Sequence, residues 1–267
     1  MGRVIMTASG KGGTGKTAFT ANLGAALAMQ GKLVVLIDMD MGLRNLDVAL
    51  GLESSIVYDV SDVLNGSCSL DEALIKDTDC ENLYFIASPQ TKDASAVDTS
   101  ALDKLWERLS ERFDFCIIDS PAGMDGGFKY AMQGAQEAII VTVPETAALR
   151  DADRVISCLE ENGTENIRLV INKVRPDMIE RGIMMNIDDC MDILQTPLLG
   201  IVRDDERLIA DSLQGKLAVW DNDSPAGCAF KNIAMRILGM DVPIMNMEDK
   251  KPGFFEKLRI LFGKSNK

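Results

Sequence analysis

Short runs of apolar residues recur along this chain, and most of the intervals between them have the periodicity of helices. The runs lie near residues 3–8, 33–38, 83–87, 114–118, 138–143, 167–172 and 198–202. They are continuously apolar, as in residues 33–37 and 138–141, and do not alternate with polar residues. Such runs are typical of parallel strands buried on both faces. The pattern predicts an α/β fold, a doubly wound and mostly parallel sheet with helices on both faces, and a ligand at the carboxyl ends of the strands.

The domain organisation follows from length and from the position of prolines. A chain of 267 residues with 46% hydrophobic content can bury one large core. We expect one domain over residues 1–240 and a linker over residues 241–252, where two prolines stand among mixed charges. An amphipathic segment follows at residues 253–264, and the polar residues 88–100 are predicted to form a loop.

Charge and composition exclude several classes of function. The net charge of −13 argues against a general affinity for nucleic acid, which is bound by clustered lysine and arginine. The sequence has no histidine, so imidazole-based catalytic triads and histidine zinc sites are excluded. The six cysteines form no Cys-x-x-Cys pair, which favours buried, reduced thiols. We find no signal peptide and no apolar run long enough to span a bilayer, and we expect the protein in the cytoplasm.

One glycine-rich segment predicts phosphate chemistry. Gly-Lys-Gly-Gly-Thr-Gly-Lys-Thr occupies residues 10–17, between an apolar strand and a predicted helix from Lys16 to about Met29, and it matches the P-loop pattern. Glycines turn backbone N–H groups toward phosphate, Lys16 can reach the β- and γ-phosphates, and Thr17 can bind Mg²⁺. A turn that binds nothing is the alternative, but the strand and helix around it favour a nucleotide. The predicted binding residues are Gly10, Lys11, Gly12, Gly13, Thr14, Gly15, Lys16, Thr17 and Ala18.

Three aspartates lie at the carboxyl ends of predicted strands. Asp38 and Asp40 end the second strand, and Asp119 follows the apolar run 115–118. Any one of them could instead cap a helix or end a loop, but three together beside a P-loop favour a site for Mg²⁺ and an attacking water molecule. These three residues are therefore candidate catalytic residues.

Their roles are assigned from the requirements of phosphoryl transfer, which needs positioning and charge neutralisation more than covalent chemistry. Lys16 and a Mg²⁺ ion on Thr17 would offset phosphate charge, while Asp119 would hold a water molecule bound to the metal. We expect Asp40 to orient the hydrolytic water and Asp38 to support it. Carboxylates are weak bases toward water, so we expect slow intrinsic turnover.

The last residues form a second informative segment. Residues 250–267 carry six basic side chains and one acidic one. At about 100° per residue, five large apolar side chains share an arc about 120° wide. They are Phe254, Phe255, Leu258, Leu261 and Phe262, and Lys257 and Arg259 flank the arc. A basic amphipathic helix of this kind can lie in the interface of a membrane with anionic lipids. Docking on the protein's own core is the alternative, which the linker and the acidic body disfavour.

Three motifs together resemble those of the deviant Walker A ATPases, the ParA/MinD family. They are the P-loop with Lys11, the run Gly-Leu-Arg-Asn-Leu-Asp at residues 42–47 behind Asp38 and Asp40, and Asp-Ser-Pro-Ala-Gly at residues 119–123. The similarity extends over essentially the whole chain, including residues 144–145, 150–154 and 172–173. The run at residues 42–47 is the more specific marker.

The resemblance implies further site residues. Lys11 would be the signature lysine, which reaches across an ATP-sandwich dimer to the nucleotide of the partner. Such a second cation resembles an arginine finger supplied in trans and would couple dimerisation to hydrolysis. Gly123 would join the nucleotide site and Asn172 would contact adenine. Asp151 and Asp153 would lie on a helix that binds partners, although a solvated helix face is the alternative for either one.

The resemblance also implies a function. The chain would hydrolyse ATP with Mg²⁺, form a homodimer in the ATP state, and associate with the inner face of the cell membrane as a peripheral protein. It would position the division septum by recruiting a division inhibitor of the MinC type, and an activator of the MinE type would stimulate the ATPase where one is present.

Other members of the superfamily remain alternatives. A ParA-like DNA-segregation ATPase would need a basic surface, and the body of this chain is acidic. A flagellar-number regulator also combines these motifs with an amphipathic tail, and it differs only in the fit of the tail and of residues 144–154. An iron–sulfur carrier would need a cysteine soon after Asp119, which residues 124–127 do not supply. Family members usually follow the last strand with proline, whereas this chain has Arg203, so base contacts there stay unassigned.

Overall fold

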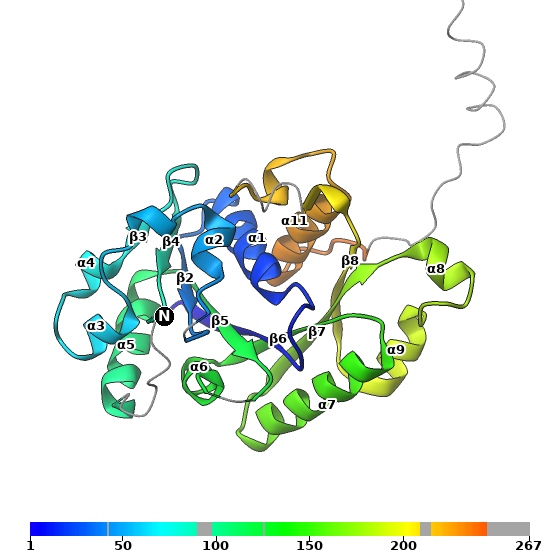
Figure 1. Cartoon of the computed structure of the whole chain (residues 1–267), viewed down its shortest axis with the longest axis horizontal. Helices are drawn as coiled ribbons and strands as arrows, with labels where there is room; N and C mark the ends of the chain where they lie inside the picture. Colours follow the sequence, from blue (N-terminus) through cyan, green and yellow to red (C-terminus); the bar gives the residue numbers. More distant parts are fainter. Residues whose placement is uncertain (42, 90–97, 125, 209–214, 245–267) are drawn as a thin grey trace, which may run out of the picture.

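In the part of the chain that the structure describes, eight strands form one sheet in the order β3-β4-β2-β5-β1-β6-β7-β8 (Figure 1). The computed structural model describes residues 1–41, 43–89, 98–124, 126–208 and 215–244. The strands are β1 (Arg3–Ser9), β2 (Val34–Asp38), β3 (Ile75–Lys76), β4 (Leu83–Ile86), β5 (Phe115–Ala122), β6 (Glu137–Thr142), β7 (Asn166–Val174) and β8 (Leu198–Arg203). The seven predicted strands are confirmed. The two-residue β3, antiparallel to β4, is too short to be read from the apolar pattern.

The order of the strands reverses beside β1. From β1 the chain crosses to β2 on one side, while β6, β7 and β8 follow in turn on the other side. Neighbouring strands other than β3 and β4 are parallel, so their carboxyl ends share one edge of the sheet. In such sheets, ligands bind in the crevice at this edge where the order reverses. The loop after β1, residues 10–15, lies at that point.

Helices cover both faces of the sheet, which confirms the doubly wound fold (Figure 1). One face carries α1 (Lys16–Met29), α2 (Leu46–Leu50), η3 (Ala218–Trp220) and α11 (Pro225–Ile237). The other carries α5 (Thr99–Arg112), α6 (Phe128–Gly134), α7 (Thr146–Glu161) and α9 (Ile187–Leu194). The shorter elements are η1 (Glu53–Ser55), α3 (Val60–Leu64), α4 (Leu70–Ala73) and α8 (Pro176–Glu180). Apolar side chains from both faces of the sheet pack beneath these layers as two core clusters.

Helix α1 is buried on nearly all sides because it packs on the sheet and also against α11, α2 and η3. Phe19 is fully buried and packs edge-on against Phe230 of α11, with ring centroids 6.0 Å apart. Gly24 faces β2, and a Cβ atom there would lie 2.5 Å from a methyl carbon of Leu36. A helix surrounded by apolar contacts is held rigidly. This packing fixes the N-terminus of α1, where the P-loop ends.

The predicted loop at residues 88–100 and the cysteines can be compared with the structure, but most of the C-terminal segment cannot. The predicted loop at residues 88–100 ends earlier, because Asp98 caps α5 through the N–H of Ser100 and the helix begins at Thr99. The six cysteines are free thiols, of which Cys80, Cys116 and Cys190 are buried. Most of the predicted linker and the whole amphipathic segment lie in residues 245–267, outside the described residues.

We also searched the described helices for membrane spans. Within the ranges that the structure describes, none of the helices is both long enough and apolar enough to cross a bilayer.

The central strand β5 offers a test of the packing. Ile117 is fully buried between β1 and β2, and Ile117→Ala should lower the free energy of unfolding by about 2–5 kcal/mol, since it removes buried methyl groups and leaves a cavity. Ile183→Ala, at a residue that is 58% exposed, is the control and should change it by about 0.5 kcal/mol or less. Urea denaturation followed by circular dichroism measures both. Equal effects would contradict the assignment of Ile117 to the core.

Candidate functional site

The P-loop leads directly into α1. Gly13 and Gly15 have φ values of 82° and 85°, in the left-handed region that favours glycine. Gly15 is also the N-cap residue of α1 and has no side chain to accept from the N–H groups of the first turn. Those N–H groups and the positive end of the helix dipole can therefore be offered to an anion.

Two residues at the end of β7 hold the P-loop from the other side. Asn172 Nδ2 donates to the carbonyl oxygen of Thr14 at 2.8 Å, and Lys173 Nζ donates to that of Gly13 at 2.8 Å. A Cβ atom on Gly15 would lie 2.5 Å from Asn172 Nδ2, so this approach requires glycine. The family resemblance implied that Asn172 contacts adenine, and it gave Lys173 no role. The contact of Asn172 with adenine stays a prediction, and its position beside the P-loop is compatible with it.

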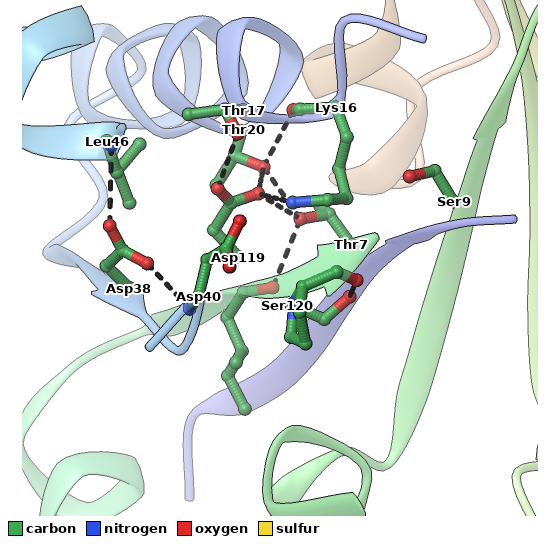
Figure 2. Close-up of polar contacts among 12 residues, drawn as sticks. Thr7, Ser9, Lys16, Thr17, Thr20, Asp38, Asp40, Leu46, Asp119 and Ser120 are labelled. Atoms are coloured by element: carbon green, nitrogen blue, oxygen red, sulfur yellow. Dashed lines mark hydrogen bonds and ion pairs between the residues drawn. The ribbon is translucent and has the colours of Figure 1, made fainter. Parts of the chain in front are cut away.

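Asp119 is the centre of the polar contacts around the P-loop (Figure 2). Lys16 Nζ lies 2.7 Å from Asp119 Oδ1, and only 6% and 1% of these side chains are exposed. Thr17 Oγ1 donates to Asp119 Oδ2 at 2.8 Å, and Thr20 Oγ1 donates to Oδ1 at 2.8 Å. The structure thus brings three predicted site residues, Lys16, Thr17 and Asp119, into direct contact.

Sequence reasoning missed two threonines in this cluster. Thr20, on α1, bonds to Asp119, and Thr7 Oγ1 on β1 lies 2.6 Å from Thr20 Oγ1 and 3.3 Å from Asp119 Oδ1. Both threonines are fully buried. The available signal was their placement, since each is a polar residue inside an otherwise apolar strand or helix. A buried hydroxyl needs a partner, and here the partner is the site carboxylate.

The buried ion pair constrains what the site can bind. Removing one partner of a buried pair typically costs about 3–5 kcal/mol, because the other charge is left uncompensated in a medium of low polarity. Lys16 can therefore leave Asp119 only for another anion, and Asp119 can accept only a cation or a hydrogen-bond donor in its place. A nucleotide phosphate and a hydrated metal ion satisfy both demands together.

Asp38 lies on the neighbouring strand and is fully buried. Its carboxylate accepts from the N–H of Asp40 at 2.8 Å and from that of Leu46 at 3.4 Å. Burial, with the charge of Asp119 beside it, raises the pKa of Asp38 to about 7. Asp38 thus holds the turn after β2 that carries Asp40. Figure 2 shows Asp40 near the pair of Lys16 and Asp119.

The oxygen atoms of this site suit Mg²⁺ better than a metal ion whose ligands all come from protein side chains. Among the described residues, no cluster of three or more Cys, Asp or Glu side chains could hold a metal ion. Mg²⁺ usually keeps several water molecules and takes few protein ligands besides phosphate oxygens. Thr17 Oγ1 can ligate such an ion directly, and Asp119 can accept from its water.

Lys11 lies apart from this cluster. Its Nζ pairs with Glu145 Oε2 at 2.7 Å, and 35% and 61% of these side chains are exposed. Gly10 packs against α7, where a Cβ atom would lie 2.2 Å from the carbonyl carbon of Asp151. Gly123, with φ of 78°, donates its N–H to the carbonyl oxygen of Ser9 at 2.9 Å. These predicted residues therefore frame the P-loop, but Lys11 does not reach Asp119.

The predicted partner-binding residues lie on α7. Asp153 is exposed, and Asp151 is half-buried and pairs with Arg154 at 3.8 Å. Because Gly10 packs against Asp151, α7 touches the P-loop directly. The end of β8 lies beside the end of β7, since Arg203 is in register with Val174 of β7.

Comparisons with known proteins agree with this geometry. Residues 5–219 match the CobQ/CobB/MinD/ParA nucleotide binding domain. The chain is 48% identical over 247 residues to the septum site-determining protein MinD of Synechocystis, which covers 92% of this chain and 93% of that relative.

Two solved structures are similar over nearly their whole length. A chain of the MinC:MinD cell division protein complex of Aquifex aeolicus has a TM-score of 0.86 and 39% identity, covering 91% of this chain and 98% of that one. The septum site-determining protein MinD of Pyrococcus horikoshii, complexed with Mg-ADP, has a TM-score of 0.80 and 30% identity, covering 91% of this chain and 100% of that one.

The raised pKa of Asp38 predicts a pH dependence of stability. Below pH 3.8 the carboxyl is protonated in both states, whereas between 3.8 and about 7 it ionises only in the unfolded chain. Its stabilising contribution is therefore lost as the pH rises through this window. We compare the free energies of unfolding of Asp38→Asn and of the wild type, measured in urea without nucleotide. Their difference should shift in favour of the variant between pH 4 and 7 and stay constant above pH 7. A constant difference across that range would contradict the raised pKa.

Lys173 provides a test of the bracing of the P-loop. Lys173→Ala removes the bond to Gly13 and should weaken Mg-ADP binding about 3- to 10-fold, since charge-assisted bonds contribute about 1.5–3 kcal/mol when shielded and less at an exposed site. Lys76→Ala, on the distant edge strand β3, is the matched control. Titration with a fluorescent ADP analogue measures both, and equal affinities for the two variants would rule out this role.

Proposed function

The chain belongs to the MinD proteins of the CobQ/CobB/MinD/ParA nucleotide-binding family, and we propose that ATP makes two copies of it bind each other, a membrane and a division inhibitor. It is a septum site-determining ATPase that uses ATP and Mg²⁺. The observation that carries the proposal is the arrangement of two lysines around one P-loop. Lys16 is buried against Asp119, and Lys11 is partly exposed at the rim.

Lys16 acts within its own chain. When phosphates bind, Lys16 moves its ammonium group from Asp119 to phosphate oxygens, and the N–H groups of the P-loop take the same anion. The bound Mg²⁺ supplies charge neutralisation on the phosphates. Asp119 would then be free to accept from water bound to the metal, while Thr20 and Thr7 keep its carboxylate in place.

Lys11 acts on the nucleotide of the second copy. Its pair with Glu145 is exposed, and such pairs are worth about 0–1 kcal/mol, so little is lost when the lysine leaves. In the interface between two copies its charge faces the partner's phosphates, where water is excluded and a cation is more effective. ATP binding and dimerisation are coupled through this residue.

Asp40 orients the hydrolytic water in this proposal. Asp38 accepts from the N–H of Asp40, so the backbone that carries the Asp40 carboxylate is held in place before the substrate binds. An aspartate is a weak base toward water, and intrinsic turnover is therefore slow. An activator of the MinE type, where one exists, speeds hydrolysis.

Membrane binding rests on the C-terminal segment, in residues outside those described. An ATPase domain over residues 1–240 joins a linker over residues 241–252 and an amphipathic helix over residues 253–264, with Phe254, Phe255, Leu258, Leu261 and Phe262 on its apolar face. One such helix binds anionic lipids weakly, because ordering it offsets much of the apolar burial. Two helices on one dimer raise the avidity about 10²–10⁴-fold. The protein is therefore peripheral to the inner face of the membrane in its ATP state.

A division inhibitor of the MinC type binds the dimer at the membrane, on a surface that includes Asp151 and Asp153 of α7. One support is that the related Aquifex aeolicus structure is a MinC:MinD complex. The other is that α7 packs on Gly10, so the binding of a partner to α7 depends on the conformation of the P-loop. DNA segregation and regulation of flagellar number are not favoured, because the relatives at this identity are septum site-determining proteins.

Lys11→Ala tests the coupling between dimerisation and hydrolysis. The variant should bind nucleotide nearly as well as the wild type, yet remain monomeric in ATP and hydrolyse it about 10³-fold more slowly, the scale of a cation supplied in trans. Sedimentation velocity in ATP and ADP measures assembly, and phosphate release measures turnover. Lys129→Ala is the matched control. A Lys11→Ala variant that dimerises and hydrolyses normally would contradict the role of Lys11.

Sedimentation with anionic vesicles tests the membrane proposal. The intact chain should pellet with vesicles in ATP and not in ADP, because only the dimer carries two tails. A chain that ends at Pro252 should stay in the supernatant in both nucleotides. Pelleting that needs neither ATP nor the tail would overturn the proposal and would turn attention to DNA binding.

A further inference from the structure

The chain reverses direction at the end of α11. Gly239 has a φ of 82°, its N–H donates to the carbonyl oxygen of Arg236 at 3.0 Å, and the N–H of Met240 donates to that of Met235 at 3.0 Å. These two bonds form a Schellman motif, which ends a helix at a glycine. Residues 240–243 therefore turn back past the last turn of α11.

Arg236 holds this returning segment against the sheet. Its Nε donates to the carbonyl oxygen of Val242 at 2.8 Å, and its Nη2 donates to that of Pro243 at 2.7 Å. Its Nη1 donates to the carbonyl oxygen of Leu199, on β8, at 2.7 Å. The planar guanidinium presents its donors in a fixed fork, so one side chain joins α11, β8 and the segment after the helix.

The packing of α11 on β8 is shaped for this contact (Figure 1). Gly200 lies where the helix approaches, and a Cβ atom there would lie 2.5 Å from Ile233 Cγ1 and 3.2 Å from Arg236 Nη1. A second arginine holds the same end of the helix, since Arg3 Nη1 donates to the carbonyl oxygen of Ile237 at 2.6 Å and Arg3 Nε pairs with Glu137.

The partners of Arg236 distinguish it from an ordinary helix-ending residue. A basic residue in the last turn commonly interacts with the terminal carbonyl groups of its own helix and with the helix dipole. The three carbonyl groups that Arg236 contacts instead belong to β8 and to the segment after α11. Its bonds therefore locate that segment and do more than terminate the helix.

We propose that Arg236 is the anchor of the membrane tether, fixing on β8 the point from which the C-terminal segment leaves the ATPase domain. This inference rests on the proposed membrane binding by the tail. With the anchor, the chain available as tether runs from about residue 244 to 252; without it, the tether begins near Gly239. Because effective concentration falls roughly as the −3/2 power of tether length, loss of the anchor should weaken the two-tailed attachment about twofold.

The closing experiment uses the full chain and the variant Arg236→Lys, which keeps the charge and loses the fork. Hydrogen exchange, read by mass spectrometry on a peptide that includes residues 239–244, should be about tenfold faster, since charge-assisted bonds are lost. In ATP, the amount of phosphatidylglycerol and phosphatidylcholine vesicles needed for half-maximal sedimentation should rise about twofold. ATP hydrolysis without vesicles should stay unchanged, which also shows that the variant is folded.

Lys231→Gln is the matched control, because Lys231 is also on α11 but bonds to Asn222, away from the tether. It should keep the exchange rate of the wild type. Unchanged exchange in Arg236→Lys would overturn the anchor, and faster exchange with unchanged vesicle binding would overturn its role in the tether. Failure of the wild type to bind vesicles in ATP would overturn the membrane proposal and the tether role together, and the exchange data would separate that outcome from a failure of the anchor itself.

Discussion

A lysine and an aspartate meet out of contact with solvent at the start of α1, and the rest of the site is arranged around that ion pair. Lys16 is the first residue of α1 and Asp119 lies on β5, and two buried threonines complete the hydrogen bonds of the carboxylate. Neither charge can be left alone at this depth. An incoming ligand must supply an anion for the lysine and a cation or a donor for the aspartate, and a nucleotide with magnesium supplies both.

The geometry of that pair depends on packing far from it. Helix α1 can bring Lys16 to β5 because it is buried along its length and because Gly24 allows it to lie close on β2. From the other side, Asn172 and Lys173 of β7 hold two successive carbonyl groups of the P-loop. A core of this density transmits small displacements, so a contact on α7, which touches Gly10, is well placed to alter the P-loop.

The strands, the central helix and three members of the buried cluster, Lys16, Thr17 and Asp119, could be predicted from sequence because each leaves a local signal. Continuous apolar runs mark parallel strands, and the spacing of glycines and Lys16 marks the P-loop. What sequence could not supply were partners distant along the chain. The bonds of Thr7 and Thr20 to Asp119, the pairing of Lys11 with Glu145, and the support of the P-loop by Lys173 depend on which elements become neighbours in the sheet. Sheet order is a global property, and no short stretch of sequence encodes it.

The central claim is that each catalytic site is completed by a second copy of the chain through Lys11. It is tested most directly by mixing two inactive variants, Lys11→Ala and Asp40→Ala, and measuring ATP hydrolysis. In a mixed dimer, the site on the Lys11→Ala chain keeps its own Asp40 and receives Lys11 from the other chain. An equimolar mixture should then regain ATP hydrolysis, up to about a quarter of the wild-type rate, which is the value for random pairing, since a mixed dimer holds one Lys11 in place of two. A mixture no more active than the two variants measured separately would mean that Lys11 does not act across the dimer, and the account would be wrong.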